Sequence, residues 1–439
     1  MTRRAVVTGI GLISPLGAGR QAHQDGWASG RSFVGPITRL DPGPLPFRAA
    51  GEVREFKARD WVDNRKNLKL MTRPVRLGVA GAHMAMVDAG LPTGAQDPAP
   101  GEAGPIVDPI RFALFVGAPH AHGEAKDLLP ALERSTASGE FDLVKFGAEG
   151  LPLVHPLWLL KGLSNNVLGF SSQRYKAMGP NSNLSGSGAG GAQAIGEGLR
   201  AIRDDRADIA LCGGYDCLLT VEGLTGYGRL GLLTTQQDRP PEQACRPFDK
   251  ARDGFAPAEG ACFFVVEELE HARARGATVF GEIAGVGDGM DAHHPASPHP
   301  EGRGLLSASR AALRSAGAGP DEVAMVVAHA SGSVAFDPVE AVAIRSILGD
   351  ARAEQVPVTA PKGAMGHTVA ASGAFNAAAA LLALQAGAVP PTANLEDPDP
   401  ACRIRHVQGE PVPLANGRLA LVHSAGLGGQ ATSLAIAAV

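Results

Sequence analysis

The chain has 439 residues, of which 44% are hydrophobic, and it carries a formal net charge of −4. This length supports a large core and more than one folding unit, while the small charge and the lack of Lys/Arg runs argue against nucleic acid or an anionic membrane as partner. We expect no membrane span, because no apolar stretch reaches roughly 18 to 20 residues, and the N-terminus lacks a signal peptide's apolar core.

The five cysteines are an odd number without Cys-x-x-Cys pairs. This pattern favours a reduced, cytoplasmic protein whose thiols pack as small apolar side chains, and it predicts no metal site. The 57 glycines and 33 prolines are too many for a helical bundle and fit a fold with many strand–helix turns.

In the first half of the chain, short apolar strands alternate with glycine turns. Residues 4–8 predict a strand that ends in a tight turn at Gly9 and Gly11; a dinucleotide site is disfavoured there, because the next glycine, Gly17, is not at the fingerprint spacing. Apolar periodicity predicts a helix over 73–89, and Pro, Gly and Asp predict a loop over 91–109. Further strands are expected over 111–117, 207–214, 262–268 and 279–286, and a charged helix over 267–275.

The second half repeats this pattern. A strand over 325–328 ends at His329, and the last strand, 419–423, precedes the glycine turn 425–429. Helices are expected over 338–347 and 372–385. This alternation predicts an α/β protein with two similar layered units.

Short motifs are spread over nearly the whole chain. They are Ala5–Gly11 with Ser14–Gly17, Gly51–Phe56, Gly179–Asn181, Gly191–Gly196, Cys245–Lys250 with Arg252–Phe255, Glu259–Gly260, Glu267–Ala272, His329–Ser333 with Asp337, Lys362–His367 and Gly426–Gly429. In this order and spacing they resemble the thiolase-fold condensing enzymes, specifically the elongating β-ketoacyl-ACP synthases of fatty-acid and type II polyketide assembly. The resemblance implies two similar α/β halves with mixed five-stranded sheets and helices, 1–268 and 269–439, an active site between them and a two-fold dimer.

The family's nucleophilic cysteine is replaced here. In the gapless alignment that Gly179–Asn181 and Gly191–Gly196 define, Gly188 falls on the cysteine, and a hydrogen atom cannot carry an acyl thioester. Ser185 and Ser187 precede it, but neighbours in an extended strand point to opposite faces, so we expect Ser187 to be turned away from the site. Hydroxyls that satisfy local backbone groups are the simpler interpretation of both serines.

The resemblance implies that the remaining catalytic groups are present. His329 and His367 match the two histidines that promote malonyl-ACP decarboxylation, and Lys362 matches the lysine that assists them. The backbone N–H groups of Gly188 and Leu427 match the oxyanion donors.

Further positions match or depart from the family pattern. Ser331 and Ser333 replace threonines that contact the pantetheine arm. Asn376 stands where the family usually has the glutamate that pairs with the lysine, so Lys362 is expected to lack its counter-charge. Leu427 replaces a gating phenylalanine.

Three hypotheses follow from this pattern. Gly188-Ala-Gly-Gly191 is similar to the chain-length factors of type II polyketide systems, which implies a ketosynthase-like subunit without acyl transfer, paired with an active ketosynthase. Retention of His329, His367 and Lys362 favours the alternative of an enzyme that decarboxylates malonyl-ACP or condenses acyl groups without an acyl-enzyme. The third hypothesis is a non-enzymatic acyl- or ACP-binding protein. All three imply acyl carrier protein as partner, a heterodimer or homodimer, and no resident cofactor, because phosphopantetheine carries the substrates.

Overall fold

The computed structural model describes residues 3–62, 64–92, 107–120, 124–136, 139–414 and 418–439. Its main sheet has eleven strands. The first half contributes β1 (Ala5–Ser14), β2 (Gly17–Ala18), β5 (Phe112–Gly117), β6 (Asn181–Leu184), β7 (Ile209–Cys217) and β8 (Glu259–Glu268). The second half contributes β9 (Gly281–Met290), β10 (Val323–Val327), β11 (Val358–Thr359), β14 (Leu419–Ala425) and β15 (Gln430–Ala437). Two small sheets pair β3 (Gly35–Pro36) with β4 (Ala49–Ala50) and β12 (Ala388–Val389) with β13 (Val412–Pro413).

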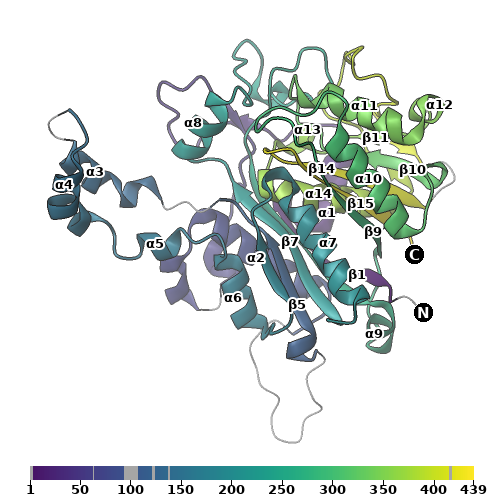
Figure 1. The fold of residues 1–439 in the computed structure, drawn as a ribbon, viewed down its shortest axis with the longest axis horizontal. Helices are drawn as coiled ribbons and strands as arrows, with labels where there is room; N and C mark the ends of the chain where they lie inside the picture. The colour runs from purple at the N-terminus through teal and green to yellow at the C-terminus, as the bar shows by residue number, and fades with distance from the viewer. Residues whose placement is uncertain (1–2, 63, 93–106, 121–123, 137–138, 415–417) are drawn as a thin grey trace, which may run out of the picture.

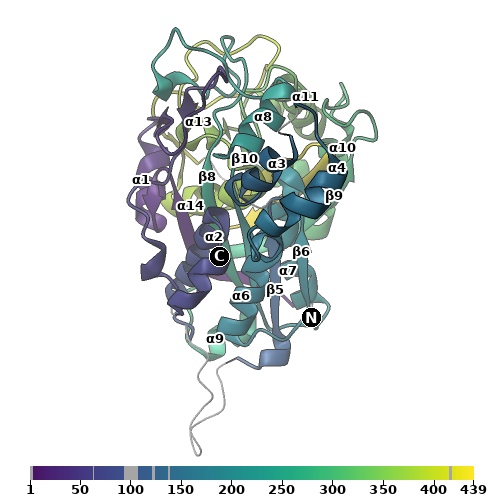
Figure 2. The same cartoon turned by 90° about the vertical axis from the view of Figure 1, so that its left-hand side faces the viewer.

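The helices pack against the faces of the main sheet (Figure 1). They are α1 (Arg20–Ala28), α2 (Arg73–Asp88), α3 (Leu129–Ser135), α4 (Leu143–Lys145), α5 (Trp158–Lys161), α6 (Asn166–Tyr175), α7 (Gly190–Arg203), α8 (Val221–Arg229), α9 (Leu269–Ala274), α10 (Arg303–Ala316), α11 (Phe336–Leu348), α12 (Asp350–Ala353), α13 (Lys362–Met365) and α14 (Ser372–Ala386). Helices α3, α4 and α5 extend to one side of the molecule and form an arm, residues 124–136 and 139–163 (Figure 1). In Figure 2 this side faces the viewer, so α3 and α4 lie in front of the body.

The strand order contains an internal repeat. The first half runs β1-β8-β7-β5-β6 and the second β9-β15-β14-β10-β11, and the two meet where β1 pairs with β9. In each group the first two pairings are antiparallel and the last two are parallel. The prediction of two similar halves with mixed five-stranded sheets is confirmed, while the division at residues 268 and 269 stays a prediction.

The long central strands β1, β7 and β8 are buried on both faces because helices cover each side. In β7, Ala210 and Cys212 pack with α7 and α14, whereas Ile209 and Leu211 pack with α2. Helix α10 covers the corresponding outer face of β9 and β15. Helices α7 and α14 contact each other in the middle layer, and they bring the start of α7 close to the ends of β10 and β14.

The expectation that no apolar stretch reaches membrane length was wrong. Residues Val369–Ala386 form an 18-residue helical segment that is apolar enough to cross a membrane, but 83% of it is buried inside the protein. Composition alone could not reveal this, since a central core helix and a membrane helix pass the same test. The segment contains α14, the central helix of the fold.

The tight turn predicted at Gly9 and Gly11 was also wrong. Strand β1 continues through both glycines to Ser14, and a Cβ atom at Gly11 would lie 2.0 Å from the carbonyl oxygen of Gly81. A Cβ at Gly9 would lie 2.3 Å from the oxygen of Ala85. Glycine here permits close approach of β1 to α2 rather than a change of direction.

Most other predicted elements are confirmed with ends shifted by a few residues, as β5, β7, β8, β9, β10, β14, α2, α9, α11 and α14. The prediction that 419–423 is the last strand was wrong, because β15 follows the glycine turn and is buried on both faces, so it lacks alternating polarity. Of the predicted loop 91–109, residues 93–106 lie outside the described residues, and Pro109–Arg111 forms a short 3-10 turn.

Candidate functional site

The sequence-predicted site residues come together where turns from both halves meet. His329 lies just after β10, His367 follows α13, and Leu427 follows β14. One cavity is lined by His329, Ser331, Ser333, His367 and Leu427, together with Ser187 of the turn before α7. Lys362 and Gly188 lie behind this wall rather than on it.

The His329 imidazole is buried and held in one tautomer. Its backbone N–H donates to Glu340 Oε1 at 2.7 Å, and its Nδ1 accepts from the backbone N–H of Ala425 at 3.2 Å. Because Nδ1 is an acceptor, the ring proton lies on Nε2. Burial, with the nearby charge of Lys362, lowers the pKa of His329 well below its usual value, so the ring is neutral at pH 7.

His367 faces His329 across the cavity. The ring centroids are 5.3 Å apart at 83°, and the edge of His367 also packs against Phe255 at 4.7 Å. Burial lowers the pKa of His367 well below its usual value. Its Nδ1 has no hydrogen-bond partner within the described part of the chain. Two neutral imidazoles therefore line one cavity and can offer N–H donors to a carbonyl oxygen.

Lys362 contacts the backbone of His329 from outside the cavity. Its ammonium group is buried and donates to the carbonyl oxygen of His329. Burial lowers the pKa of Lys362 to about 8, and the charge of Glu340 opposes part of that shift. The Asn376 amide is bonded to backbone: it donates to the carbonyl oxygens of Ala328 at 3.0 Å and His423 at 2.9 Å.

The serine loop is fixed by a buried carboxyl group. Asp337 accepts hydrogen bonds from the backbone N–H groups of Ser331 and Gly332, both at 3.1 Å, and from Phe248 at 2.9 Å. Burial raises the pKa of Asp337 to about 6. This anchoring keeps Ser331 and Ser333 against the cavity.

The turn before α7, which is predicted to correspond to the family's nucleophile turn, leaves no room for a side chain at Gly188. A Cβ atom at Gly188 would lie 2.1 Å from the carbonyl oxygen of Ala425 and 3.1 Å from Cε1 of His329. No real Cβ tolerates the first distance, so a side chain at this position requires the end of β14 to move. A side chain at the position predicted for the family's thiol would therefore meet backbone.

The prediction that Ser187 is turned away was wrong. Strand β6 ends at Leu184, and Ser187 begins a 3-10 turn with φ 48°, so the alternation of an extended strand does not apply. Its hydroxyl oxygen accepts from the backbone N–H of Leu427 at 3.4 Å. One of the two predicted oxyanion donors therefore already faces a side chain of the protein itself.

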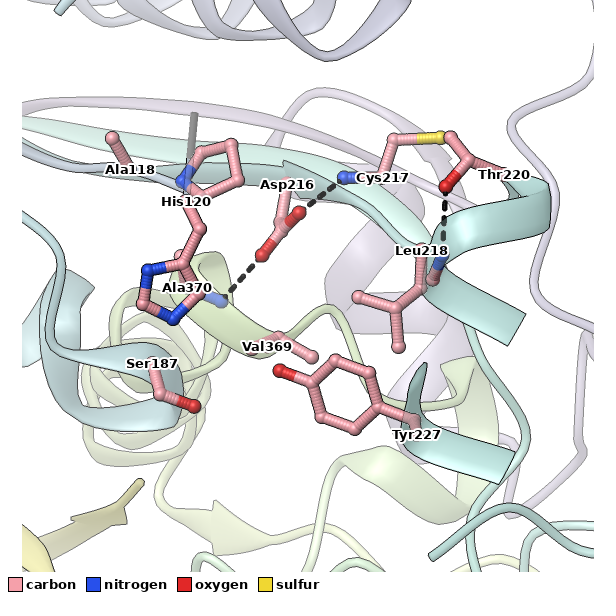
Figure 3. A pocket seen from close by; sticks show the side chains of 12 residues that line it. Ala118, His120, Ser187, Asp216, Cys217, Leu218, Thr220, Tyr227, Val369 and Ala370 are labelled. Atoms are coloured by element: carbon pink, nitrogen blue, oxygen red, sulfur yellow. Dashed lines mark hydrogen bonds between the residues drawn. The ribbon is translucent and has the colours of Figure 1, made fainter. Parts of the chain in front are cut away.

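A second cavity lies on the other side of Ser187 and Tyr227, which line both cavities. Figure 3 shows the Tyr227 hydroxyl directed toward Ser187. Asp216 lies in this wall, where its oxygens accept from the N–H groups of Cys217 at 2.7 Å and Ala370 at 3.0 Å (Figure 3). Burial raises the pKa of Asp216 to about 7.

Sequence reasoning missed four of these residues: Asp216, Tyr227, Glu340 and His423. Glu340 could have been found, because it lies three residues after Asp337 on one helix and both carboxylates face the turn after β10. His423 carried no such signal. Among the described residues, no group of three or more His, Cys, Asp or Glu side chains could hold a metal ion.

Comparisons with known proteins agree with this geometry. The family description "Beta-ketoacyl synthase, N-terminal domain" matches residues 2–272, and "Beta-ketoacyl synthase, C-terminal domain" matches residues 280–396. The chain is 33% identical over 433 residues to 3-oxoacyl-(acyl-carrier-protein) synthase 2 of Synechocystis sp., covering 99% of this chain and 97% of that protein. It is 33% identical to the tetracenomycin polyketide synthase ketoacyl synthase alpha subunit of Streptomyces glaucescens, covering 92% and 90%.

Solved structures give the same fold. The ishigamide ketosynthase/chain length factor superposes with a TM-score of 0.85 at 30% identity, covering all of both chains. A type II polyketide acyl-carrier protein in complex with its ketosynthase superposes with a TM-score of 0.84 at 27% identity, again over all of both chains.

Proposed function

Because this chain belongs to the β-ketoacyl synthase family, we propose that it is a ketosynthase-like subunit that forms no acyl-enzyme and works beside an active ketosynthase, as a chain-length factor does. The observation that carries the proposal is the space at Gly188. The position lacks a nucleophile, and the Ala425 carbonyl fills the volume that a thiol-bearing Cβ would need. Removal of the thiol is thus accompanied by closure of its site.

The state of one predicted oxyanion donor, the backbone N–H of Leu427, supports the same proposal. Acyl transfer to a nucleophile requires two N–H donors aimed at the thioester oxygen. The N–H of Leu427 is directed at the Ser187 hydroxyl instead. A thioester carbonyl would have to displace that hydroxyl before it could bind.

Exposed apolar side chains on the arm are a further argument for a partner subunit. Its exposed large apolar side chains are Leu129, Phe141, Leu143, Val144, Leu151, Leu153, Leu159, Leu160 and Leu163. Soluble monomers rarely expose so many on one projecting segment. Strand β6 is the last strand of the main sheet, and among the described residues one of its edges pairs with no other strand. A ketosynthase subunit of the same fold could cover both.

Sedimentation of the chain alone and co-expressed with a cognate ketosynthase tests this proposal. We expect poor solubility or a loose dimer alone, and a stable one-to-one complex with the ketosynthase. Val144→Glu on the arm should weaken the complex at least tenfold, whereas Val342→Glu on the distant helix α11 should leave it intact. A tight homodimer that ignores the ketosynthase would contradict the proposal.

A second candidate function is decarboxylation of malonyl-ACP, favoured by the two neutral imidazoles in one cavity. In this step the bond from the carboxylate carbon to Cα breaks, CO₂ leaves, and the electron pair forms an enolate whose oxygen accepts from the imidazole N–H groups; Cα then takes a proton from water. Phosphopantetheine would reach the cavity past Ser331 and Ser333.

Release of CO₂ from malonyl-ACP by the wild type, His329→Ala and His367→Ala separates the two functions. Decarboxylation predicts a wild-type rate above the uncatalysed one and a loss of about tenfold or more in each variant. Equal rates in all three proteins would exclude decarboxylation and leave the first proposal, a subunit that forms no acyl-enzyme.

A further inference from the structure

A chain of buried polar side chains runs behind the histidine pair. Ser433 Oγ lies 2.9 Å from Ser309 Oγ, which lies 3.0 Å from His423 Nε2. His423 Nδ1 lies 3.0 Å from Glu340 Oε1. Each of these side chains is at most 3% exposed. This series of hydrogen-bonded side chains ends at the Glu340 carboxylate, which accepts from the backbone N–H of His329.

The serine, histidine and glutamate have the order of a hydrolytic triad, but the geometry excludes that role. Ser309 and His423 have no exposed surface, and neither lines the cavities described above. No substrate can reach the serine hydroxyl. The arrangement must act on other residues of the protein.

The protonation of this chain follows from its donors and acceptors. The Glu340 carboxylate accepts from the backbone N–H groups of His329 and Ala330, both at 2.7 Å. An ionised carboxylate only accepts, so His423 donates from Nδ1 and its Nε2 accepts from the Ser309 hydroxyl. A neutral His423 therefore satisfies both neighbours.

We infer that His423 is a positioning residue for His329: it holds Glu340, and Glu340 holds the turn after β10 so that His329 keeps Nδ1 as the acceptor from Ala425 and its proton on Nε2. His329 follows β10, His423 lies within the neighbouring parallel strand β14, and Ala425 is two residues beyond His423 on the same strand. One strand thus supplies both the buried support of His329 and the N–H that fixes its ring.

The same bonds explain why no carboxylate from the described part of the chain is bonded to Lys362. Glu340 is the acceptor of three other donors, so its charge reaches Lys362 only through space. Lys362 donates instead to the carbonyl oxygen of His329. The backbone N–H and C=O of His329 are therefore both held by buried charged groups.

Nitrogen NMR of protein labelled with ¹⁵N-histidine tests the assignment without requiring any catalysis or partner, so its outcome is independent of the subunit proposal. Signals of His329 are identified by their loss in His329→Gln. The wild type should show His329 in one tautomer, protonated on Nε2. His423→Leu should abolish this single tautomer, and His423→Asn, whose amide can still donate to Glu340, should restore it.

The matched control is His406→Leu. His406 is another largely buried histidine, with Nε2 2.7 Å from the Cys402 carbonyl oxygen, and its loss should leave His329 unchanged. If His423→Leu does not fold, Glu340→Gln keeps the volume but replaces an acceptor oxygen with a donor, and it should also disturb the His329 tautomer. An unchanged His329 in His423→Leu or Glu340→Gln, or an equal change in His406→Leu, would overturn the inference.

Discussion

The two walls of the central cavity differ in how much room they leave for chemistry. On one wall, the Ser187 hydroxyl accepts from the Leu427 N–H, and directly behind it Gly188 lies against the Ala425 carbonyl. On the opposite wall, His329 and His367 keep their rings in the cavity, and buried charges hold the backbone of His329. We therefore propose that acyl attachment and charge stabilisation are separable in this chain: backbone fills the position predicted for the nucleophile, while the two imidazoles remain in the cavity.

Restoring the thiol should have the largest effect on this contrast. Gly188→Cys places Cβ against a main-chain oxygen that cannot rotate away, and we expect a loss of about 2 to 3 kcal/mol in the free energy of unfolding without any condensing activity. Denaturant unfolding and a condensation assay with malonyl-ACP measure both.

The matched control for that variant is Gly169→Cys, in a helix where an added Cβ meets nothing within 4 Å. It should cost less than about 1 kcal/mol. If the Gly188→Cys protein were stable and catalysed condensation, the space around residue 188 would have to accommodate a thiol.

The ionisation of Asp216, which lines the second cavity, should give the next largest effect. Its folded pKa is about 7 against 3.8 in the reference state, so between pH 4 and 7 the folded protein keeps a proton that the unfolded chain releases. Wild-type stability from this group is therefore highest below pH 4 and is lost as the pH rises to 7. Asp216→Asn lacks this term, so its cost relative to wild type should be greater at pH 5 than at pH 8 by about 2 kcal/mol.

Urea unfolding at the two pH values measures this difference, and Asp238→Asn, at an exposed position, is the control. A cost for Asp216→Asn that is equal at pH 5 and pH 8 would show that the carboxyl is ionised throughout.

The smallest effect concerns the backbone of Ser187. Its φ of 48° is a left-handed conformation that costs a residue with a Cβ about 1 kcal/mol more than glycine. Ser187→Gly and Ser187→Ala both lose the hydroxyl, so the glycine variant should be the more stable by about 1 kcal/mol in thermal or urea unfolding.

At Ser185, which has no positive φ, the alanine variant should equal or exceed the glycine variant. The same preference for glycine at both positions would remove the evidence for a strained turn.

The sequence allowed prediction of the fold and of one wall of the site, for different reasons. Strands such as β5 and β10 are continuous apolar runs that end at the cavity, so motif spacing located His329, and the Lys362–His367 motif located its partner. The other wall failed because Ser187 was treated as part of an extended strand, whereas β6 ends three residues earlier.

Contacts that join distant segments were beyond sequence reasoning. The approach of the Ala425 carbonyl to Gly188 depends on the packing of β14 against the turn before α7. His423 acquires its role only because β10 and β14 are neighbours and Glu340 on α11 lies behind both. No local pattern specifies such a juxtaposition.

The most direct test of the central claim is the intact mass of the protein after incubation with acyl-ACP. We predict no added acyl mass, because Gly188 has no nucleophile and its surroundings leave no space for one. Peptide mapping of residues 181–196 should likewise find Ser185 and Ser187 unmodified. A stoichiometric acyl adduct on Ser187, or on any of the five cysteines, would contradict the account.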